Sequence, residues 1–284
     1  MSKFRGEQVL PWPRQAAVST QIRVLEESIG LQLVDRSERP LQLTEAGRVF
    51  FQFAEETLNR AESLGNFFKE LIGGVAGHVR IGASLSVGAY LLPRIIGKVL
   101  KEYPKVKMDL FTHNREIVCD AVSQSRVDFG IVLSDELPDN VQATPLRSEP
   151  FYIVAASNHP LARKRNVAPK ELQSTAFVVG MSNEYTEMVN RMIRSVGIMR
   201  YTIGFRISNF EGRKECVSAG VGVTVLPEFT VAEEFRKKTL APINLRGSRL
   251  SAEIMLLENT RHLRSPSVKL VKEVIVKRIQ RLQL

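Results

Sequence analysis

Strand-like and helix-like segments alternate after residue 77, and this alternation constrains the fold of the 284-residue chain most strongly. VRIGA (79–83) and KMDLFT (107–112) are short apolar runs, and amphipathic stretches follow them at 90–103 and 115–124. Strands that alternate with helices in this way are typical of parallel sheets covered by helices. We therefore predict an α/β domain.

A second series of the same kind begins at FYIVAAS (151–157) and reaches GVTVLP (222–227), and an amphipathic helix over 266–282 ends the chain. The two series predict two α/β lobes in a domain spanning residues 78–284, with the second lobe at about 150–255. Lobes of this kind bind a ligand in a cleft at the carboxyl ends of their strands, where helix N-termini direct free N–H groups inward.

Near the start of the chain, residues 16–29 have the pattern of an amphipathic helix. Apolar side chains fall on one helix face at offsets of 0, 4, 7 and 11: Val18, Ile22, Leu25 and Ile29. The helix is expected to end at Gly30. Its opposite face carries Ser19, Thr20 and Arg23, which suit contacts to base edges and phosphates; a solvated polar face is the alternative interpretation.

The segment LQLVDRSERPLQLT (31–44) predicts two short strands around a turn at 37–40, so a winged hairpin follows the helix. Thr44 then caps a long helix in which four residues recur every seven positions: Phe50, Thr57, Leu64 and Leu71. Residues 48–72 are therefore predicted to be a linker helix that pairs two subunits, although packing on its own domain stays open. Gly73, Gly74 and Gly77 are expected to form a flexible joint.

The net charge of +10 is distributed unevenly along the chain. Residues 1–75 contain 9 Lys and Arg against 10 Asp and Glu, whereas residues 76–284 contain 31 against 20. The excess of positive charge thus lies outside the segment whose helix at 16–29 suits DNA contacts. It favours solubility or attraction of anionic ligands over DNA binding.

Other classes of function find little support in the sequence. Cys119 and Cys216 lack metal-ligand spacing and are expected to be small buried residues. The four histidines are scattered, and no nucleophile elbow, P-loop or metal cluster accompanies them, so we predict no enzyme, no cofactor and no metal. No export signal or membrane-spanning run is found, which predicts a cytoplasmic protein without a membrane partner.

The segment QAAVSTQIRVLEESIGLQLVDRSERPLQLTEAG (15–47) resembles the recognition helix and wing of LysR-type transcriptional regulators. Further segments, including VDFGIV, PFYIVAASNHPLA and VSAGVGVTVLPE, are similar to the effector domain of that family. GASLSVGAYLLP (82–93) is similar to the branch that includes regulators of RuBisCO operons and of sulfur metabolism. The resemblance covers essentially all of the chain after residue 14.

The resemblance implies a winged helix-turn-helix, a linker helix and a periplasmic-binding-protein-like effector domain, in a homodimer or homotetramer that binds a DNA operator. The residues that it places at DNA, together with the polar helix face, are Gln15, Ala16, Ala17, Ser19, Thr20, Arg23, Arg36 and Arg39. Relatives often carry proline where this chain has Ala16, which is a mild change because alanine also suits a first helical turn.

For the effector, the resemblance implies a site at the start of the helix near Val87, where hydroxyls and free N–H groups suit a small anionic metabolite. N-capping by serine is the structural alternative. The implied effector residues are Ser84, Leu85, Ser86, Asn114, Ile131, Ser182, Asn183, Asn209 and Val221. Binding between the lobes would shift the population of lobe arrangements and so change how DNA is bent.

Upstream, the sequence departs from the family pattern. A DNA-binding domain of three helices needs two helices of about ten residues each before the recognition helix, and 14 residues precede Gln15. Pro11 and Pro13 prevent one continuous helix there. We therefore expect residues 1–47 to form a truncated winged helix-turn-helix that binds DNA weakly or not at all, through a misassigned start, a frameshift or a degenerate gene.

Three rival interpretations remain at this point. An enzyme lacks a supporting motif, and an exported solute-binding protein lacks an export signal. The third is a DNA-incompetent remnant that acts only by binding a small molecule or by forming oligomers.

Overall fold

The computed structural model describes residues 15–37, 39–73, 76–136, 141–181, 183–247, 249–260 and 263–282. The chain divides into two compact units with a boundary between Leu58 and Asn59, and each is described by itself. The expected shortage of helices in residues 1–14 lies outside the described residues. No helix in the described part is long and apolar enough to cross a membrane.

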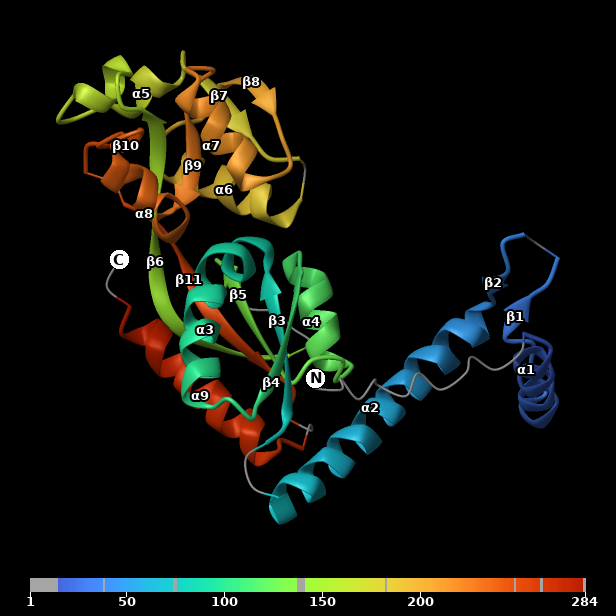
Figure 1. Cartoon of the computed structure of the whole chain (residues 1–284). Coiled ribbons are helices and arrows are strands. Elements are labelled where there is room, and N and C mark those ends of the chain that lie inside the picture. Colours follow the sequence, from blue (N-terminus) through green and yellow to red (C-terminus); the bar gives the residue numbers. More distant parts are fainter. Residues whose placement is uncertain are drawn as a thin grey trace, which may run out of the picture. The chain divides into compact units, whose positions relative to one another are not determined.

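In the first unit, the predicted order of helix, hairpin and helix is confirmed (Figure 1). Helix α1 (Gln15–Ile29) ends at Gly30, whose φ of 74° requires the left-handed conformation that glycine adopts easily. Strands β1 (Val34–Asp35) and β2 (Gln42–Leu43) pair antiparallel. Helix α2 (Glu45–Gly73) begins after Thr44, whose hydroxyl accepts a hydrogen bond from the Gly47 N–H at 2.9 Å.

A buried carboxylate attaches the hairpin to α1. Glu26 is 8% exposed and accepts hydrogen bonds from the N–H groups of Leu33 and Val34 at 2.8 and 3.1 Å and from Arg36 at 2.8 Å. These bonds, that from Leu33 above all, hold the pKa of Glu26 below its ordinary value. The apolar stripe of α1 is covered unevenly, because Val18 stays 37% exposed while Ile22 and Leu25 are half-buried.

The second unit contains a seven-stranded sheet in the order β10 (Leu240–Pro242), β6 (Gln142–Ala156), β11 (Leu250–Glu258), β5, β3 and β4, with β9 (Thr224–Pro227) paired to β6. Strands β3 (His78–Ser84), β4 (Lys107–His113) and β5 (Phe129–Ser134) are parallel, as predicted. Helices η1 (Val87–Leu91), α3 (Leu92–Glu102), α4 (Arg115–Ser123) and α9 (Pro266–Gln280) accompany them. We call these three strands and four helices lobe I.

Lobe I is covered by helices on both faces of its sheet (Figure 1). Alternate side chains of β5 divide between the faces: Phe129 and Ile131 join the core under α3 and α9, whereas Val132 packs under α4. Each of these three side chains is fully buried. Burial of one such side chain contributes about 1.5–3 kcal/mol. The sequence pattern of buried strands and amphipathic helices follows from this two-sided packing.

Lobe II holds a parallel pair, β7 (Ala176–Val179) and β8 (Thr202–Arg206), with β9 (Thr224–Pro227) and β10 (Leu240–Pro242). Its helices are α6 (Glu184–Ser195), α7 (Phe210–Ser218) and α8 (Glu228–Lys237), with the short turns η2 (Pro160–Arg163) and α5 (Pro169–Leu172). Two α/β lobes were predicted, and the fold confirms them.

Two long antiparallel strands join the lobes. β6 (Gln142–Ala156) and β11 (Leu250–Glu258) run through both, paired from Phe151–Leu250 to Gln142–Glu258 (Figure 1). The sequence analysis predicted the second half of β6, and it missed residues 142–150. It also gave no prediction for α8 or β10.

Candidate functional site

A pocket of about 40 Å³ lies between lobe I and lobe II. It forms where parallel strands of both lobes end, because β3, β4 and β7 all lead into lining residues at their carboxyl ends. The lining residues are Ser84, Leu85, Ser86, Asn114, Arg115, Leu133, Asn183, Glu184, Tyr185, Ser208, Phe210 and Arg213.

Five of the residues that the family resemblance implied for effector binding line this pocket: Ser84, Leu85, Ser86, Asn114 and Asn183. Three others lie elsewhere. Ile131 is fully buried in the core of lobe I, Asn209 adjoins the lining residues Ser208 and Phe210, and Val221 is 42% exposed beyond the end of α7. Ser182 lies outside the described residues.

Four helices begin at or beside the pocket. η1 follows Ser86 and α4 follows Asn114, while α6 and α7 are capped by Asn183 and Asn209, whose side chains accept from the Thr186 and Gly212 N–H groups. Helix N-termini carry partial positive charge and free N–H groups, so their convergence favours an anion.

The two serines of this site do not cap the helix after β3. The Ser84 hydroxyl accepts a hydrogen bond from the Leu133 N–H at 3.2 Å, across the ends of β3 and β5. Ser86 is 2% exposed, and its Oγ has no hydrogen-bond partner among the described residues. N-capping by serine, the structural alternative, therefore does not explain Ser86.

Arg213 is a pocket residue that the sequence analysis missed. It lies on α7, is 4% exposed, and places its guanidinium 4.8 Å from the ring centroid of Phe210 and 5.4 Å from that of Tyr185. Burial lowers the pKa of Arg213 and raises that of Tyr185. In the sequence, Arg213 stands in the polar stretch EGRKE, which gives no sign that one of its charges is buried.

Several contacts join the lobes around the pocket. Tyr90 of η1 donates a hydrogen bond to Glu211 of α7 at 2.8 Å, and the Arg115 N–H donates to Glu184 at 2.8 Å. Arg191 of α6 donates two hydrogen bonds, of 2.9 and 2.8 Å, to the carboxylate of Asp135, which follows β5. Hydrogen bonds thus join the two lobes in this arrangement.

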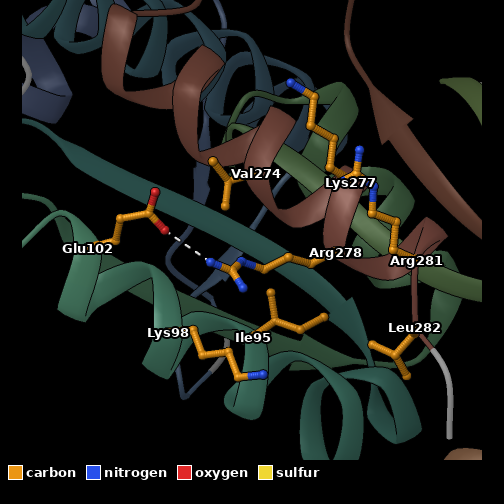
Figure 2. Close-up of a pocket in the computed structure, with 8 residues that line it drawn as sticks. All are labelled: Ile95, Lys98, Glu102, Val274, Lys277, Arg278, Arg281 and Leu282. Atoms are coloured by element: carbon orange, nitrogen blue, oxygen red, sulfur yellow. Dashed lines mark hydrogen bonds and ion pairs between the residues drawn. The ribbon is translucent and has the colours of Figure 1, made fainter.

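A larger hollow of about 520 Å³ lies within lobe I, between α3 and α9 (Figure 2). Lys98, Lys277, Arg278 and Arg281 bring four positive charges to its wall, and Ile95 and Val274 supply apolar surface. Arg278 pairs with Glu102, with 3.0 Å between Nη2 and Oε2, and a dashed line marks this pair in Figure 2. These cations are partly or largely exposed, so water solvates them and no ligand is needed to explain them.

The residues implied at DNA all lie in the first unit. Ala16, Ala17, Ser19, Thr20, Arg23 and Arg39 are exposed, and the side chain of Gln15 lies outside the description. Thr20 donates to the Ala16 carbonyl at 2.9 Å, and Arg36 is bound to Glu26. Arg36 thus also supports the hairpin.

A two-lobed α/β domain that follows a helix and a hairpin in the sequence is the domain order of ligand-responsive regulators. Residues 73–280 match the LysR substrate binding domain, and residues 14–48 match the bacterial regulatory helix-turn-helix protein, lysR family. The first match alone covers more than half of the chain. The protein therefore belongs to the LysR family of transcriptional regulators.

Curated relatives agree with this assignment. A probable RuBisCO transcriptional regulator of Thalassiosira pseudonana is 25% identical over 86% of this chain and 82% of its own length. The RuBisCO operon transcriptional regulator of Acidithiobacillus ferrooxidans is 28% identical over 81% of this chain and 74% of its own length.

Solved structures share the fold. A full-length OxyR variant from Pseudomonas aeruginosa matches with a TM-score of 0.72 and 20% identity, over 95% of this chain and 86% of its own. The Synechocystis CcmR regulatory domain in complex with 2-PG matches with a TM-score of 0.64 and 18% identity, over 72% and 98%. The effector binding domain of QuiR in complex with shikimate gives a TM-score of 0.62 and 16% identity, over 73% and 99%.

Proposed function

We propose that this LysR-type regulator senses a small anionic metabolite in the pocket between its lobes and controls transcription through that binding. The observation that carries the proposal is the buried Ser86 hydroxyl, which has no partner among the described residues and stands where helix N-termini of both lobes meet. A buried polar group without a partner is rare and costly, so a ligand oxygen is the natural acceptor for it. The 2-PG and shikimate bound by CcmR and QuiR support an acidic effector.

The effector acts by changing the balance between lobe arrangements. A ligand that touches Ser86 of lobe I and α6 or α7 of lobe II binds best when the lobes are close together, so it raises the population of that arrangement. The contacts Tyr90–Glu211 and Arg191–Asp135 form in the same arrangement and add to its stability. The resulting change in lobe angle is transmitted to the DNA-binding part.

Ser86→Ala tests the effector site. Because Ser86 Oγ makes no hydrogen bond within the described part, its removal is expected to leave thermal stability nearly unchanged. Loss of a hydrogen bond to a charged ligand should weaken effector binding roughly 10- to 100-fold. The affinities of the wild-type chain and of Ser86→Ala for a panel of small anions are measured by calorimetry. Ser218→Ala, at an exposed serine on α7, is the matched control; equal affinities for all three proteins would contradict the proposal.

We further propose that α1 reads the DNA major groove and that the hairpin contacts phosphates, with residues 1–47 as the DNA-binding part. The weak or absent DNA binding expected from the sequence stays a prediction. Ser19, Thr20 and Arg23 are exposed on α1, and Arg39 is exposed in the hairpin turn, which supports this role. Arg39→Ala is expected to lower the slope of log affinity against log salt by about 0.9, the value for one lost phosphate contact. An unchanged slope in a fluorescence-anisotropy salt titration would remove Arg39 from the interface.

Residues 48–72 are proposed as a linker helix that pairs two copies of the chain into a homodimer or homotetramer, with residues 78–284 as the effector domain. Several apolar side chains of α2 are strongly exposed, which supports such pairing: Val49 66%, Phe53 67%, Leu58 70%, Leu71 59% and Ile72 90%. We place the protein in the cytoplasm, where transcription occurs.

A further inference from the structure

We propose that Arg213 supplies the counter-charge for the effector, and that the effector carries a compact oxyanion group, a carboxylate, sulfate or phosphate, bound between Arg213 of lobe II and Ser86 of lobe I. This inference rests on the proposed function and assigns the residue and the chemical group that the function leaves open.

Arg213 is a buried cation that lacks an anionic partner among the described residues. It is 4% exposed, and the partners that favour its charge are the phenols Tyr185 and Tyr90, with no carboxylate of the described residues among them. The ring faces of Phe210 and Tyr185 compensate in part. Its Nε has no hydrogen-bond partner in the described part. A buried charge in this state is strongly unfavourable, which points to a partner that arrives from solution.

Two neighbouring cations differ from Arg213, because each has an acidic partner. Lys214, the next residue, is 6% exposed and is neutralised by Glu211 at 2.8 Å and Glu234 at 2.6 Å. Arg115, the other cation on the pocket wall, bonds to Ser134 at 2.9 Å and lies 3.8 Å from Glu136. The protein thus provides acidic acceptors for both of these charges, and its described residues provide none for Arg213.

The polar groups left without partners at this pocket, within the described ranges, can all donate. They are Ser86 Oγ from lobe I and Arg213 Nε from lobe II, and the Tyr185 phenol beside Arg213 makes no geometric hydrogen bond of its own with the described residues. Since burial raises the pKa of Tyr185, its phenol stays protonated and can donate. An oxyanion offers acceptor oxygens and no donor, so it complements this set, whereas an ammonium group would meet a like charge.

The space at the site limits the size of the group. With the lobes as they stand, the space open to the centre of a water molecule is about 40 Å³, a few times the roughly 10–15 Å³ that one water needs by the same measure. Gly180 makes room for the guanidinium, because a Cβ at this position would lie 2.5 Å from Arg213 Nη2. A compact head group fits beside Arg213, and a larger body requires the lobes to part.

Arg213→Met tests the inference, with Arg236→Met, at an exposed arginine of α8, as a control of equal charge change. Thermal unfolding of the full chain is followed against sulfate, phosphate and acetate, with chloride keeping the ionic strength constant. We expect at least one oxyanion to raise the Tm of the wild-type chain and of Arg236→Met in a saturable way. Arg213→Met should bind that anion at least about 30-fold more weakly, as expected for truncation of a buried charge partner.

A second readout separates a binding role from a structural one. Without oxyanion, Arg213→Met should unfold at the same temperature as the wild-type chain or at a higher one, because it removes an uncompensated buried charge. Should Arg213→Met fail to fold, Arg213→Lys, which keeps the charge and loses the planar fork, is expected to bind the anion about tenfold more weakly.

The outcomes distinguish the two proposals. If none of the three anions stabilises the wild-type chain, the proposed anion-sensing function falls and this inference with it. If an anion stabilises the wild-type chain and both Arg213 variants equally, the role of Arg213 is overturned while the proposed function stands. The anion that responds identifies the head group as planar carboxylate or tetrahedral oxyanion.

Discussion

Replacing Glu149 by glutamine is expected to stabilise the second unit above about pH 7, by at most about 3 kcal/mol. Glu149 lies on β6 and is 1% exposed; it accepts a hydrogen bond from the Phe229 N–H at 3.1 Å, and Arg147 Nε lies 3.7 Å from it. Burial raises the pKa of this carboxyl to about 7, from 4.5. The Phe229 N–H and Arg147 oppose the rise without cancelling it.

The direction of the pH effect follows from that rise. A carboxyl whose pKa is higher in the folded state makes its full contribution to stability below pH 4.5, and the contribution is lost as the pH rises through about 7. Glutamine stays neutral throughout. Urea unfolding at about pH 5 and about pH 8 should therefore give a larger difference between variant and wild type at the higher pH. Glu187→Gln, at an exposed site on α6, is the control, and equal differences at both pH values would contradict the assignment.

Glu70→Ala is expected to destabilise the second unit by about 2–4 kcal/mol, since it leaves the buried donor groups of Ser267 without an acceptor. Glu70 is 5% exposed near the end of α2, and its carboxylate accepts from the Ser267 N–H at 2.8 Å and from the Ser267 hydroxyl at 2.7 Å. Ser267 stands in the first turn of α9, where a negative charge is favoured.

A double-mutant cycle with Ser267→Ala measures the coupling, and a coupling above about 1 kcal/mol is expected for a charged hydrogen bond. Glu62→Ala removes a 59% exposed carboxylate that lies 3.4 Å from Arg80, and it should cost less than about 1 kcal/mol. Equal losses for Glu62→Ala and Glu70→Ala would contradict the buried role of Glu70.

Local sequence patterns predicted most elements of this fold. Gly30 and Thr44 marked a helix end and a helix start correctly, because both act on neighbouring backbone groups. The sequence analysis missed the first half of β6 because it contains Pro145 and Pro150, and proline is uncommon inside strands. The pairing of β6 with β11 also links residues about a hundred positions apart, so no local pattern indicates it. Of the three glycines expected to form a joint, Gly73 is the last residue of α2, a Cβ at Gly77 would lie 1.8 Å from the Glu70 carboxylate, and Gly74 lies outside the described residues.

The candidate site likewise contains residues that could be predicted from the sequence and residues that could not. Ser84, Ser86, Asn114 and Asn183 could be predicted because the family resemblance implied them, and each lies at or after the end of a strand and before a helix. Arg213 could not, because its burial depends on Tyr185, 28 positions earlier in the chain, and its lack of a carboxylate partner among the described residues is a property of the folded lobe. The contacts between lobes, such as Arg191–Asp135, likewise join residues with no local signature.

The Nε–H resonance of Arg213 gives the most direct test of binding between the lobes. In an arginine-labelled full chain, this resonance is identified by its loss in Arg213→Lys, and it is followed during titration with sulfate, phosphate and acetate. We predict a saturable shift of the Arg213 signal with at least one of these anions, at the concentration that raises the Tm. An Arg213 signal that none of the anions moves, while exposed arginines such as Arg281 respond, would contradict the account.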